Sequence, residues 1–358
     1  MKNWTATIAI SYFLRKKRYF RFMILVTGGT GLVGSHLLYF LLKENGKVRA
    51  IHRKNSDVAS VKKVFALYTP DAESLFNKIE WVEANITDVP ELILAFENIT
   101  KVYHCAAFIS FDPSKYKVLK KANVEGTANI VNLCLANNIQ KICYVSSVAT
   151  FGSTLNGGLI SEENQWNPEE RNSVYAITKF GAEMEVWRGT QEGLDAVIIN
   201  LGVILGTSPN GDGSGTIIAL GSSGIPFYPS GGMGVVDVQD VVKAMILLMD
   251  SEIKNEQFIL VGENIPYKKL LSKLAQLFGK KMPSKKLPKK IMFFLSSADW
   301  LASKLFGKKR KLFKATVRSM FKTSFYDASK VKSSLEFQFT PLEVTLERIV
   351  KETKKASN

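Results

Sequence analysis

The segment from Thr27 to Gly34, TGGTGLVG, joins a short apolar run to a longer apolar pattern. Met23 to Val26 suits a buried strand, and Leu32 to Leu42 repeats apolar residues along a helix that stops at Gly46. Glycines at such a strand-to-helix turn let a pyrophosphate approach the backbone and the helix N-terminus. The turn therefore predicts a dinucleotide site, with a simple tight turn as the alternative. The predicted cofactor contacts in it are Thr27, Gly28, Gly29, Thr30, Gly31, Leu32, Val33 and Gly34.

The alternation of strand and helix continues to about residue 205. Strands are predicted near residues 23–26, 48–51, 79–83, 101–104, 141–145 and 196–200, with helices between them. This order predicts an α/β fold with a Rossmann-type, doubly wound parallel sheet. We expect a nucleotide-binding domain at 23–205 and a smaller, mainly helical substrate-binding part at 206–358. Residues 1–22 form an N-terminal extension, either a start site placed too early or a membrane-surface arm.

A tyrosine and a lysine follow at helical spacing. Tyr175 and Lys179 are four residues apart, so a helix places both on one face. A nearby ammonium favours the phenolate and is expected to lower the tyrosine pKa from about 10. Ser147 stands at the end of the apolar run Ile142 to Val145, where its hydroxyl can hold a substrate carbonyl. We predict that Ser147, Tyr175 and Lys179 are catalytic, with Tyr175 as the proton donor and acceptor.

These residues, with TGGTGLVG ahead of them, resemble the extended short-chain dehydrogenase/reductase superfamily, also called the NAD-dependent epimerase/dehydratase family. Three more segments look like family motifs: Tyr103 to Ala107, Asn123 to Thr127 and Ser146 to Gly152. In the family they line the cofactor, fix the active-site geometry and carry the catalytic serine. The resemblance extends the expected cofactor contacts to Ala106, Ala107, Asn123, Tyr175 and Lys179.

Phe227 to Val241 resembles the family's strand and helix start beyond the substrate pocket, where we interpret Asp240 as the helix cap. Two positions depart from the family. Asn85 replaces an aspartate beside the adenine, which keeps an acceptor and loses the charge. Leu201 stands where a proline commonly follows the sixth strand. Asn85 and Ile86 remain expected cofactor contacts.

The end of the second strand indicates the cofactor. An NAD enzyme should present Asp or Glu there to accept from the ribose 2′-hydroxyl, but His52, Arg53 and Lys54 follow this strand. A carboxylate would repel a 2′-phosphate, whereas a guanidinium binds it through paired charge-assisted hydrogen bonds. Arg53 and Lys54 therefore predict NADP, with NAD as the alternative cofactor. The alternative interpretation of both residues is a solvated, charged loop.

Ser147 is followed by Val148 and Ala149. Dehydratases of the superfamily carry Thr-Asp-Glu at these positions, so this chain lacks the two carboxyl groups that perform dehydration and we do not expect a dehydratase. The better likeness is to dihydroflavonol-reductase-like and 3β-hydroxysteroid-dehydrogenase-like members, which act on a secondary alcohol of an apolar substrate. We expect an NAD(P)-dependent oxidoreductase acting on CH–OH groups of a small molecule. Two alternatives stay open: a nucleotide-sugar epimerase with tightly bound NAD, and a non-catalytic NADP-binding regulatory protein.

The three cysteines show no C-x-x-C spacing and the three histidines are not paired at ligand spacing, so we expect no metal site. Buried reduced thiols are typical of a cytoplasmic protein.

The positive charge is concentrated in two segments. Between Lys280 and Lys322 there are 14 Lys and Arg residues against the single acid Asp299, and residues 1–22 hold six Lys and Arg residues and no acid. No module that reads nucleic acid accompanies this charge, so nucleic acid is not an expected partner.

Ile291 to Phe306 is an apolar run of helix length, flanked by lysines and too short to span a bilayer. We interpret it as a packed wall of the substrate pocket. The alternative is a membrane-surface helix that attaches the enzyme to anionic lipid and implies a lipid-like substrate. A homodimer is also left open.

Overall fold

The computed structural model describes residues 23–154, 157–209, 215–307, 310 and 312–357. Its centre is one sheet of seven strands in the order β10-β6-β5-β4-β1-β2-β3. Every neighbouring pair in this sheet is parallel. All six predicted strands are present, which confirms the Rossmann-type fold. The strands are β1 (Met23–Thr27), β2 (Val48–His52), β3 (Ile79–Glu83), β4 (Ile99–His104), β5 (Lys141–Ser147), β6 (Ala196–Leu201) and β10 (Glu256–Leu260).

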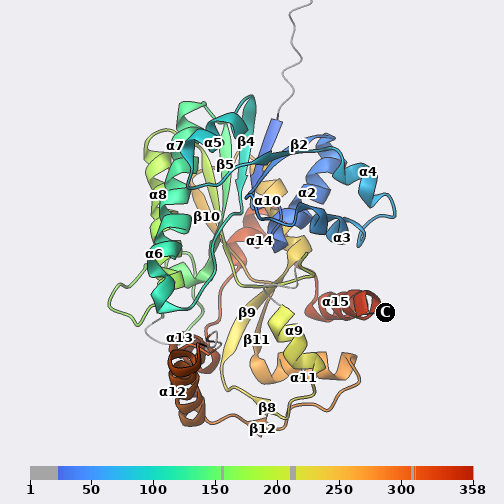
Figure 1. Ribbon diagram of the computed structural model, residues 1–358, viewed down its shortest axis with the longest axis vertical. Helices are drawn as coiled ribbons and strands as arrows, with labels where there is room; N and C mark the ends of the chain where they lie inside the picture. Colours follow the sequence, from blue (N-terminus) through green and yellow to red (C-terminus); the bar gives the residue numbers. More distant parts are fainter. Residues whose placement is uncertain (1–22, 155–156, 210–214, 308–309, 311, 358) are drawn as a thin grey trace, which may run out of the picture.

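Helices cover both faces of this sheet (Figure 1). Because both faces are buried, successive apolar residues of a strand enter different cores: Leu25 packs on one side and Val26 on the other. One face carries α2 (Leu32–Asn45), α3 (Val61–Phe65), α4 (Ala72–Phe76) and α10 (Val238–Asp250). The other carries α5 (Val89–Ala95), α6 (Tyr116–Leu119), α7 (Gly126–Ala136) and α8 (Val174–Gln191).

The chain beyond residue 205 contributes to both parts of the molecule. Its strand β10 forms one edge of the main sheet, and its helix α10 packs on a face of that sheet. The predicted domain boundary at residue 205 therefore does not separate these two elements from the nucleotide-binding domain. The remainder lies beyond one end of that sheet (Figure 1). Together with β7 (Val203–Leu205), which precedes it, this remainder comprises α9 (Gly215–Ser222), β8 (Phe227–Tyr228), β9 (Gly232–Asp237), β11 (Glu263–Pro266), α11 (Tyr267–Leu277), β12 (Lys285–Lys286), α12 (Lys289–Phe306), α13 (Lys314–Phe321) and α15 (Leu342–Ser357). Helix α14 (Ser329–Leu335) instead packs against β10, beside the main sheet.

The prediction that Asp240 caps a helix is wrong. The cap of α10 is Asp237, whose carboxylate accepts from the backbone N–H of Gln239 at 2.8 Å. Asp240 lies in the first turn and accepts from the backbone N–H and the hydroxyl of Thr340, at 2.7 and 2.8 Å. Both aspartates suit a helix start, and only the path of the chain leading out of β9 decides between them.

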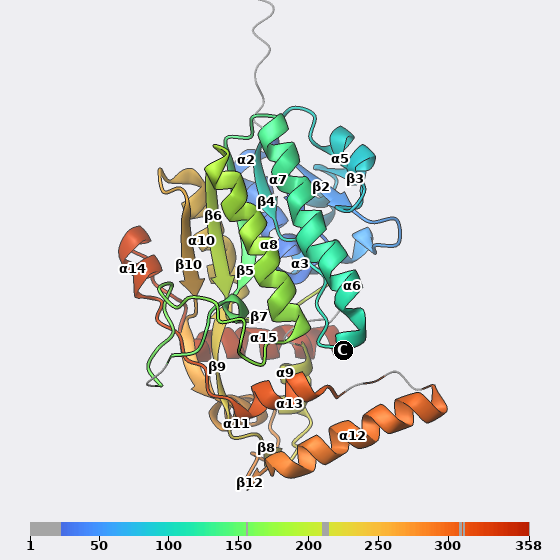
Figure 2. The ribbon, with the colours of Figure 1, turned by 90° about the vertical axis from the view of Figure 1, so that its left-hand side faces the viewer.

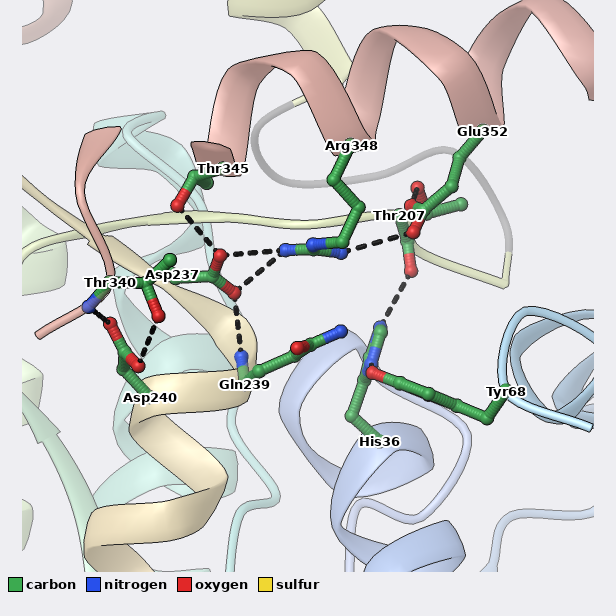
Figure 3. Close-up of polar contacts among 10 residues, drawn as sticks. All are labelled: His36, Tyr68, Thr207, Asp237, Gln239, Asp240, Thr340, Thr345, Arg348 and Glu352. Carbon is green, nitrogen blue, oxygen red and sulfur yellow. Dashed lines mark hydrogen bonds and ion pairs between the residues drawn. The ribbon is translucent and has the colours of Figure 1, made fainter. Parts of the chain in front are cut away.

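Asp237 also joins the last helix, α15, to the rest of the protein (Figure 3). Nη2 of Arg348, on α15, donates to both carboxylate oxygens of Asp237 at 2.7 and 2.8 Å. Arg348 also pairs with Glu352, which accepts from the hydroxyl of Thr207 at 2.5 Å. The side chain of Asp237 is only 2% exposed and that of Arg348 is 22% exposed, so the carboxylate of this ion pair is buried. Helix α15 therefore holds the segment that follows β7.

His36 meets that segment from α2. Its Nε2 is hydrogen-bonded to the backbone carbonyl of Thr207 at 2.9 Å, and its Nδ1 contacts the Tyr68 hydroxyl. Burial lowers the pKa of His36 to about 4. The unfolded chain then binds a proton below its usual pKa of 6.5 while the folded protein does not, so stability is complete above this pH and declines as the pH falls toward 4.

Replacing this histidine is expected to flatten the acid side of the stability curve. Between pH 6.5 and 4.5 the wild type should lose about 2 kcal/mol more free energy of unfolding than His36→Gln, measured by urea denaturation. His104, whose pKa burial lowers to about 3, is present in both proteins and serves as an internal control. Identical losses in the two proteins would contradict this role of His36.

Candidate cofactor and active site

The glycine turn between β1 and α2 packs too closely for side chains. Gly28 has φ +70°, and a Cβ there would lie 2.7 Å from the backbone nitrogen of Ala106. A Cβ on Gly34 would lie 2.2 Å from the carbonyl oxygen of Gly28. The N–H of Gly31 donates to that same carbonyl at 3.0 Å and closes the turn. The strand, the turn and the helix start are thereby held at the spacing that a backbone phosphate cradle requires.

A cavity of about 700 Å³ lies against this turn, at the carboxyl ends of the strands. In an open parallel sheet, this edge is the place where a ligand binds. Its size and its mixture of backbone, hydroxyl and apolar groups fit a dinucleotide. Nine of the predicted cofactor residues line it: Gly28, Thr30, Gly31, Leu32, Arg53, Asn85, Ile86, Ala106 and Ala107.

Other predicted residues lie behind the wall and support it. The Thr27 hydroxyl is hydrogen-bonded to Nδ1 of His104 at 2.7 Å and accepts from the N–H of Ala106 at 3.1 Å. The side chain of Asn123 binds both backbone groups of Phe108, accepting at 2.7 Å and donating at 3.0 Å. The predicted cofactor residues that do not line this cavity are Thr27, Gly29, Val33, Gly34, Lys54, Asn123, Tyr175 and Lys179.

The cavity also has lining residues that the sequence interpretation missed. Lys117 and Lys121 bring two exposed cations to it from adjoining helical segments. Their spacing of four residues was the available signal, but lysines at that spacing are common on solvated helix faces. Ser208 comes from beyond β7 and has no local signature. The other missed lining residues are Ile51, His52, Ser56, Ala84, Thr87, Cys105, Phe108, Val118 and Ala122.

Arg53 lies directly after β2 with an exposed side chain. Its backbone N–H donates to the Ser56 hydroxyl at 3.2 Å, which shapes the loop. Besides the main cavity, Arg53 lines an adjoining hollow of about 400 Å³ together with Lys54, Glu83 and Glu91. One of these carboxylates, Glu91, accepts from the backbone N–H of Asn85 at 2.7 Å. A guanidinium therefore stands at the cavity where a carboxylate would mark a 2′-hydroxyl site.

The two departures from the family pattern have plain structural outcomes. The side-chain oxygen of Asn85 accepts from the N–H and the hydroxyl of Thr87, both at 3.1 Å, so the expected acceptor is already used within its own turn. Leu201 is buried as the last residue of β6. The chain continues through Gly202, where a Cβ would lie 2.7 Å from the carbonyl oxygen of Gly234.

Ser147 and Tyr175 come together on the same edge of the sheet. Ser147 is the last residue of β5, and Tyr175 lies in the first turn of α8, which begins after the cap Ser173. The Ser147 side chain interacts with the Tyr175 phenol and acts to lower its pKa. The ring of Phe111 meets the ring of Tyr175 edge-on, with centroids 5.6 Å apart. The Tyr175 ring thus has an aromatic neighbour at the site.

Lys179 lies one turn further along α8 and is buried. Its Nζ donates to the Tyr144 hydroxyl at 2.6 Å and to the Val145 carbonyl at 2.8 Å. Burial lowers the pKa of Lys179 to about 7 and raises the pKa of Tyr175, an effect that the interaction with Ser147 opposes. The expected lowering of the Tyr175 pKa by Lys179 is therefore wrong for this structure, because the lysine is bonded to Tyr144 instead.

A buried carboxyl group, that of Glu183, lies against Ser146, the residue before Ser147. Glu183, on α8, accepts from the Ser146 hydroxyl at 2.5 Å, from the Asn200 amide at 2.9 Å and from the Thr150 hydroxyl at 3.1 Å. These contacts tie α8 to the ends of β5 and β6, and burial raises the pKa of Glu183. Sequence reasoning missed this residue, although it follows Lys179 by one further helical turn.

The sheet order, glycine cradle and serine–tyrosine pair are those of a Rossmann-fold protein of the extended short-chain dehydrogenase/reductase type. Residues 24–262 match the NAD dependent epimerase/dehydratase family. The chain belongs to this family, whose members are NAD(P)-dependent enzymes.

Individual relatives cover most of the chain. A Synechocystis sp. protein that carries the name of a dihydroflavonol 4-reductase is 27% identical over 322 residues, which is 87% of this chain and 88% of the relative. The sterol demethylase protein B of Methylococcus capsulatus is 28% identical over 75% of this chain and 78% of its own length. Among solved structures, gox2253 has a TM-score of 0.75 and 26% identity, and the match covers 93% of this chain and 98% of that one.

The fold is also shared with proteins of more distant sequence. The UDP-glucose 4-epimerase of Thermotoga maritima has a TM-score of 0.73 at 21% identity, and the match covers 94% of this chain and all of that one.

Proposed function

We propose that this protein is an NADP-dependent oxidoreductase that interconverts a ketone and a secondary alcohol on an apolar small molecule. The observation that carries this proposal is the placement of Ser147, at the end of β5, and Tyr175, in the first turn of α8, at the strand edge that also holds the glycine cradle. A hydroxyl pair in this position can grip one carbonyl oxygen and pass it a proton.

Each residue has a defined task in this reaction. The Ser147 hydroxyl orients the carbonyl oxygen, and Tyr175 donates a proton to it during reduction. The raised pKa of Tyr175 keeps the phenol protonated near neutral pH, as a donor requires. The glycine cradle, Arg53 and Lys179 would hold NADP, which supplies or accepts the hydride when bound.

An apolar substrate is supported by the residues around Tyr175. Phe111 packs edge-on against its ring, and Ile109, two residues earlier, is 63% exposed. Val148 and Ala149 follow Ser147 and bring no carboxylate to it. Exposed apolar side chains beside reactive hydroxyls favour a hydrophobic ketone over a charged sugar nucleotide. The names of the sterol- and dihydroflavonol-related proteins are in keeping with this class of substrate.

The Arg53→Ala variant tests the cofactor. We expect it to weaken NADPH binding by roughly 1.5 to 3 kcal/mol, the contribution of a hydrogen bond to a charged group, and to leave NADH almost unchanged. Calorimetric titration of both cofactors measures this, with Arg171→Ala as a matched control because Arg171 is also exposed and does not line the cavity. Equal losses for NADPH and NADH would exclude a 2′-phosphate contact.

A nucleotide-sugar epimerase remains the second candidate, favoured by the fold shared with the Thermotoga maritima enzyme over 94% of this chain. An epimerase must retain its cofactor between half-reactions, whereas a reductase exchanges it. Purified protein that keeps NAD through gel filtration would favour the epimerase. Protein that elutes without nucleotide and then binds NADPH would favour the reductase.

A further inference from the structure

Helix α12 leaves most of its apolar side chains uncovered. Its only buried residue is Ser296, so the interpretation of this run as a helix packed on the core is wrong. Phe294 is 73% exposed, Phe306 72% and Leu305 66%. Figure 2 shows the helix along the lower border of the molecule, reaching beyond the rest of the chain. The other apolar residues of α12 that are about half exposed are Ile291, Leu295, Trp300 and Leu301.

These side chains form one stripe. Ile291, Phe294, Leu295, Leu301 and Leu305 recur at the spacing that places residues on a single face of a helix. Exposed lysines flank this face at both ends of α12 and in the strand before it. No carboxylate pairs with them in the part of the chain that the structure describes. They are Lys285, Lys286, Lys289, Lys290 and Lys304.

The inner side of α12 adds a cationic hollow. A cavity of about 510 Å³ separates it from α13 and is lined by three cations, Arg310, Lys314 and Arg318, beside two aromatic rings, Trp300 and Phe313. The nearest carboxylate is Asp299, at 4.0 Å from Nε of Arg310, and it already accepts from the backbone N–H of Leu312 at 2.9 Å. The hollow therefore carries excess positive charge. Such a site fits an anionic headgroup next to apolar chains.

We propose that α12 and α13 form a docking surface for an anionic lipid membrane. The exposed stripe would enter the interface between headgroups and acyl chains, and the flanking lysines would contact the headgroups. None of the helices in the described residues is long and apolar enough to cross a bilayer. Pro113 also lines the hollow and follows Phe111 by two residues, so the docked face adjoins the side that holds Tyr175. This docking rests on α12 and α13 alone and does not depend on the proposed reaction.

The experiment is flotation of the full chain with vesicles of phosphatidylcholine alone or with added phosphatidylglycerol. We expect binding to the anionic vesicles that weakens in high salt, and little binding to the neutral ones. Phe294→Ser/Leu305→Ser/Phe306→Ser is expected to reduce the partition coefficient by at least about tenfold. Lys289→Gln/Lys290→Gln/Lys304→Gln is expected to reduce it by about fivefold per lysine.

The matched control is Ile93→Ser/Leu94→Ser on α5. These residues are 54% and 63% exposed but have Glu91 and Glu97 beside them, and we expect full vesicle binding. All variants carry residues 1–22, so differences among them report on α12. Absence of wild-type binding, or equal binding by all variants, would overturn the proposal. So would a change from dimer to monomer in the apolar variant with unchanged vesicle binding, because a second copy would then cover the stripe.

Discussion

Tyr175→Phe is expected to lower turnover of a ketone or secondary alcohol by roughly 10² to 10⁴, the usual contribution of a general acid. Phenylalanine keeps the ring that packs against Phe111 and loses the hydroxyl that interacts with Ser147. NADPH affinity should therefore stay nearly constant while kcat falls. Steady-state kinetics with calorimetric NADPH titration would separate the two quantities.

Tyr39→Phe is the matched control. Tyr39 lies on α2 and stacks on Tyr68, with ring centroids 4.4 Å apart. Phenylalanine preserves that stacking, and Tyr39 is not part of the proposed active site. We expect it to keep the wild-type rate. A wild-type rate in Tyr175→Phe, on a substrate that the wild type converts, would contradict the assigned role. Intact NADPH binding without turnover of any ketone by the wild type would favour the non-catalytic alternative.

Arg348→Met is expected to lower the free energy of unfolding by about 3 to 5 kcal/mol, because it leaves a buried carboxylate without its cation. Asp237 would keep only its contacts with Thr345 and the start of α10. Urea denaturation measures the loss. The control is Arg188→Met, whose side chain is 36% exposed in its pairs with Glu185 and Glu192 and should cost no more than about 1 kcal/mol.

Adding Asp237→Asn to Arg348→Met tests whether the two charges act as a pair (Figure 3). The amide keeps an oxygen for the helix cap and removes the unpaired charge, so the double variant should be more stable than the sum of the single changes predicts. Strict additivity, or a loss below about 1 kcal/mol in Arg348→Met, would mean that the ion pair does not hold α15 in place.

Much of the fold could be predicted because its signals are local. Each strand of the predicted sheet is a short apolar run, and each helix between strands repeats apolar residues at its own period. The turn at Gly28 and Gly34 is similarly legible, since backbone atoms come too close there for any other residue. The approach of Ser147 and Tyr175 follows from the rule that parallel strands end on one edge of the sheet.

The sequence by itself therefore determined the Rossmann core, its glycine cradle and the common sheet edge of Ser147 and Tyr175, because local strand and helix patterns combine with a general rule for parallel sheets. Only the tertiary structure decided that β10 forms one edge of the sheet, that Asp237 caps α10 and that Lys179 donates a hydrogen bond to Tyr144. It also decided that α12 turns its apolar stripe outward. These outcomes depend on which distant segments pack together and on what burial removes from water, and neither is written in the spacing of neighbouring residues.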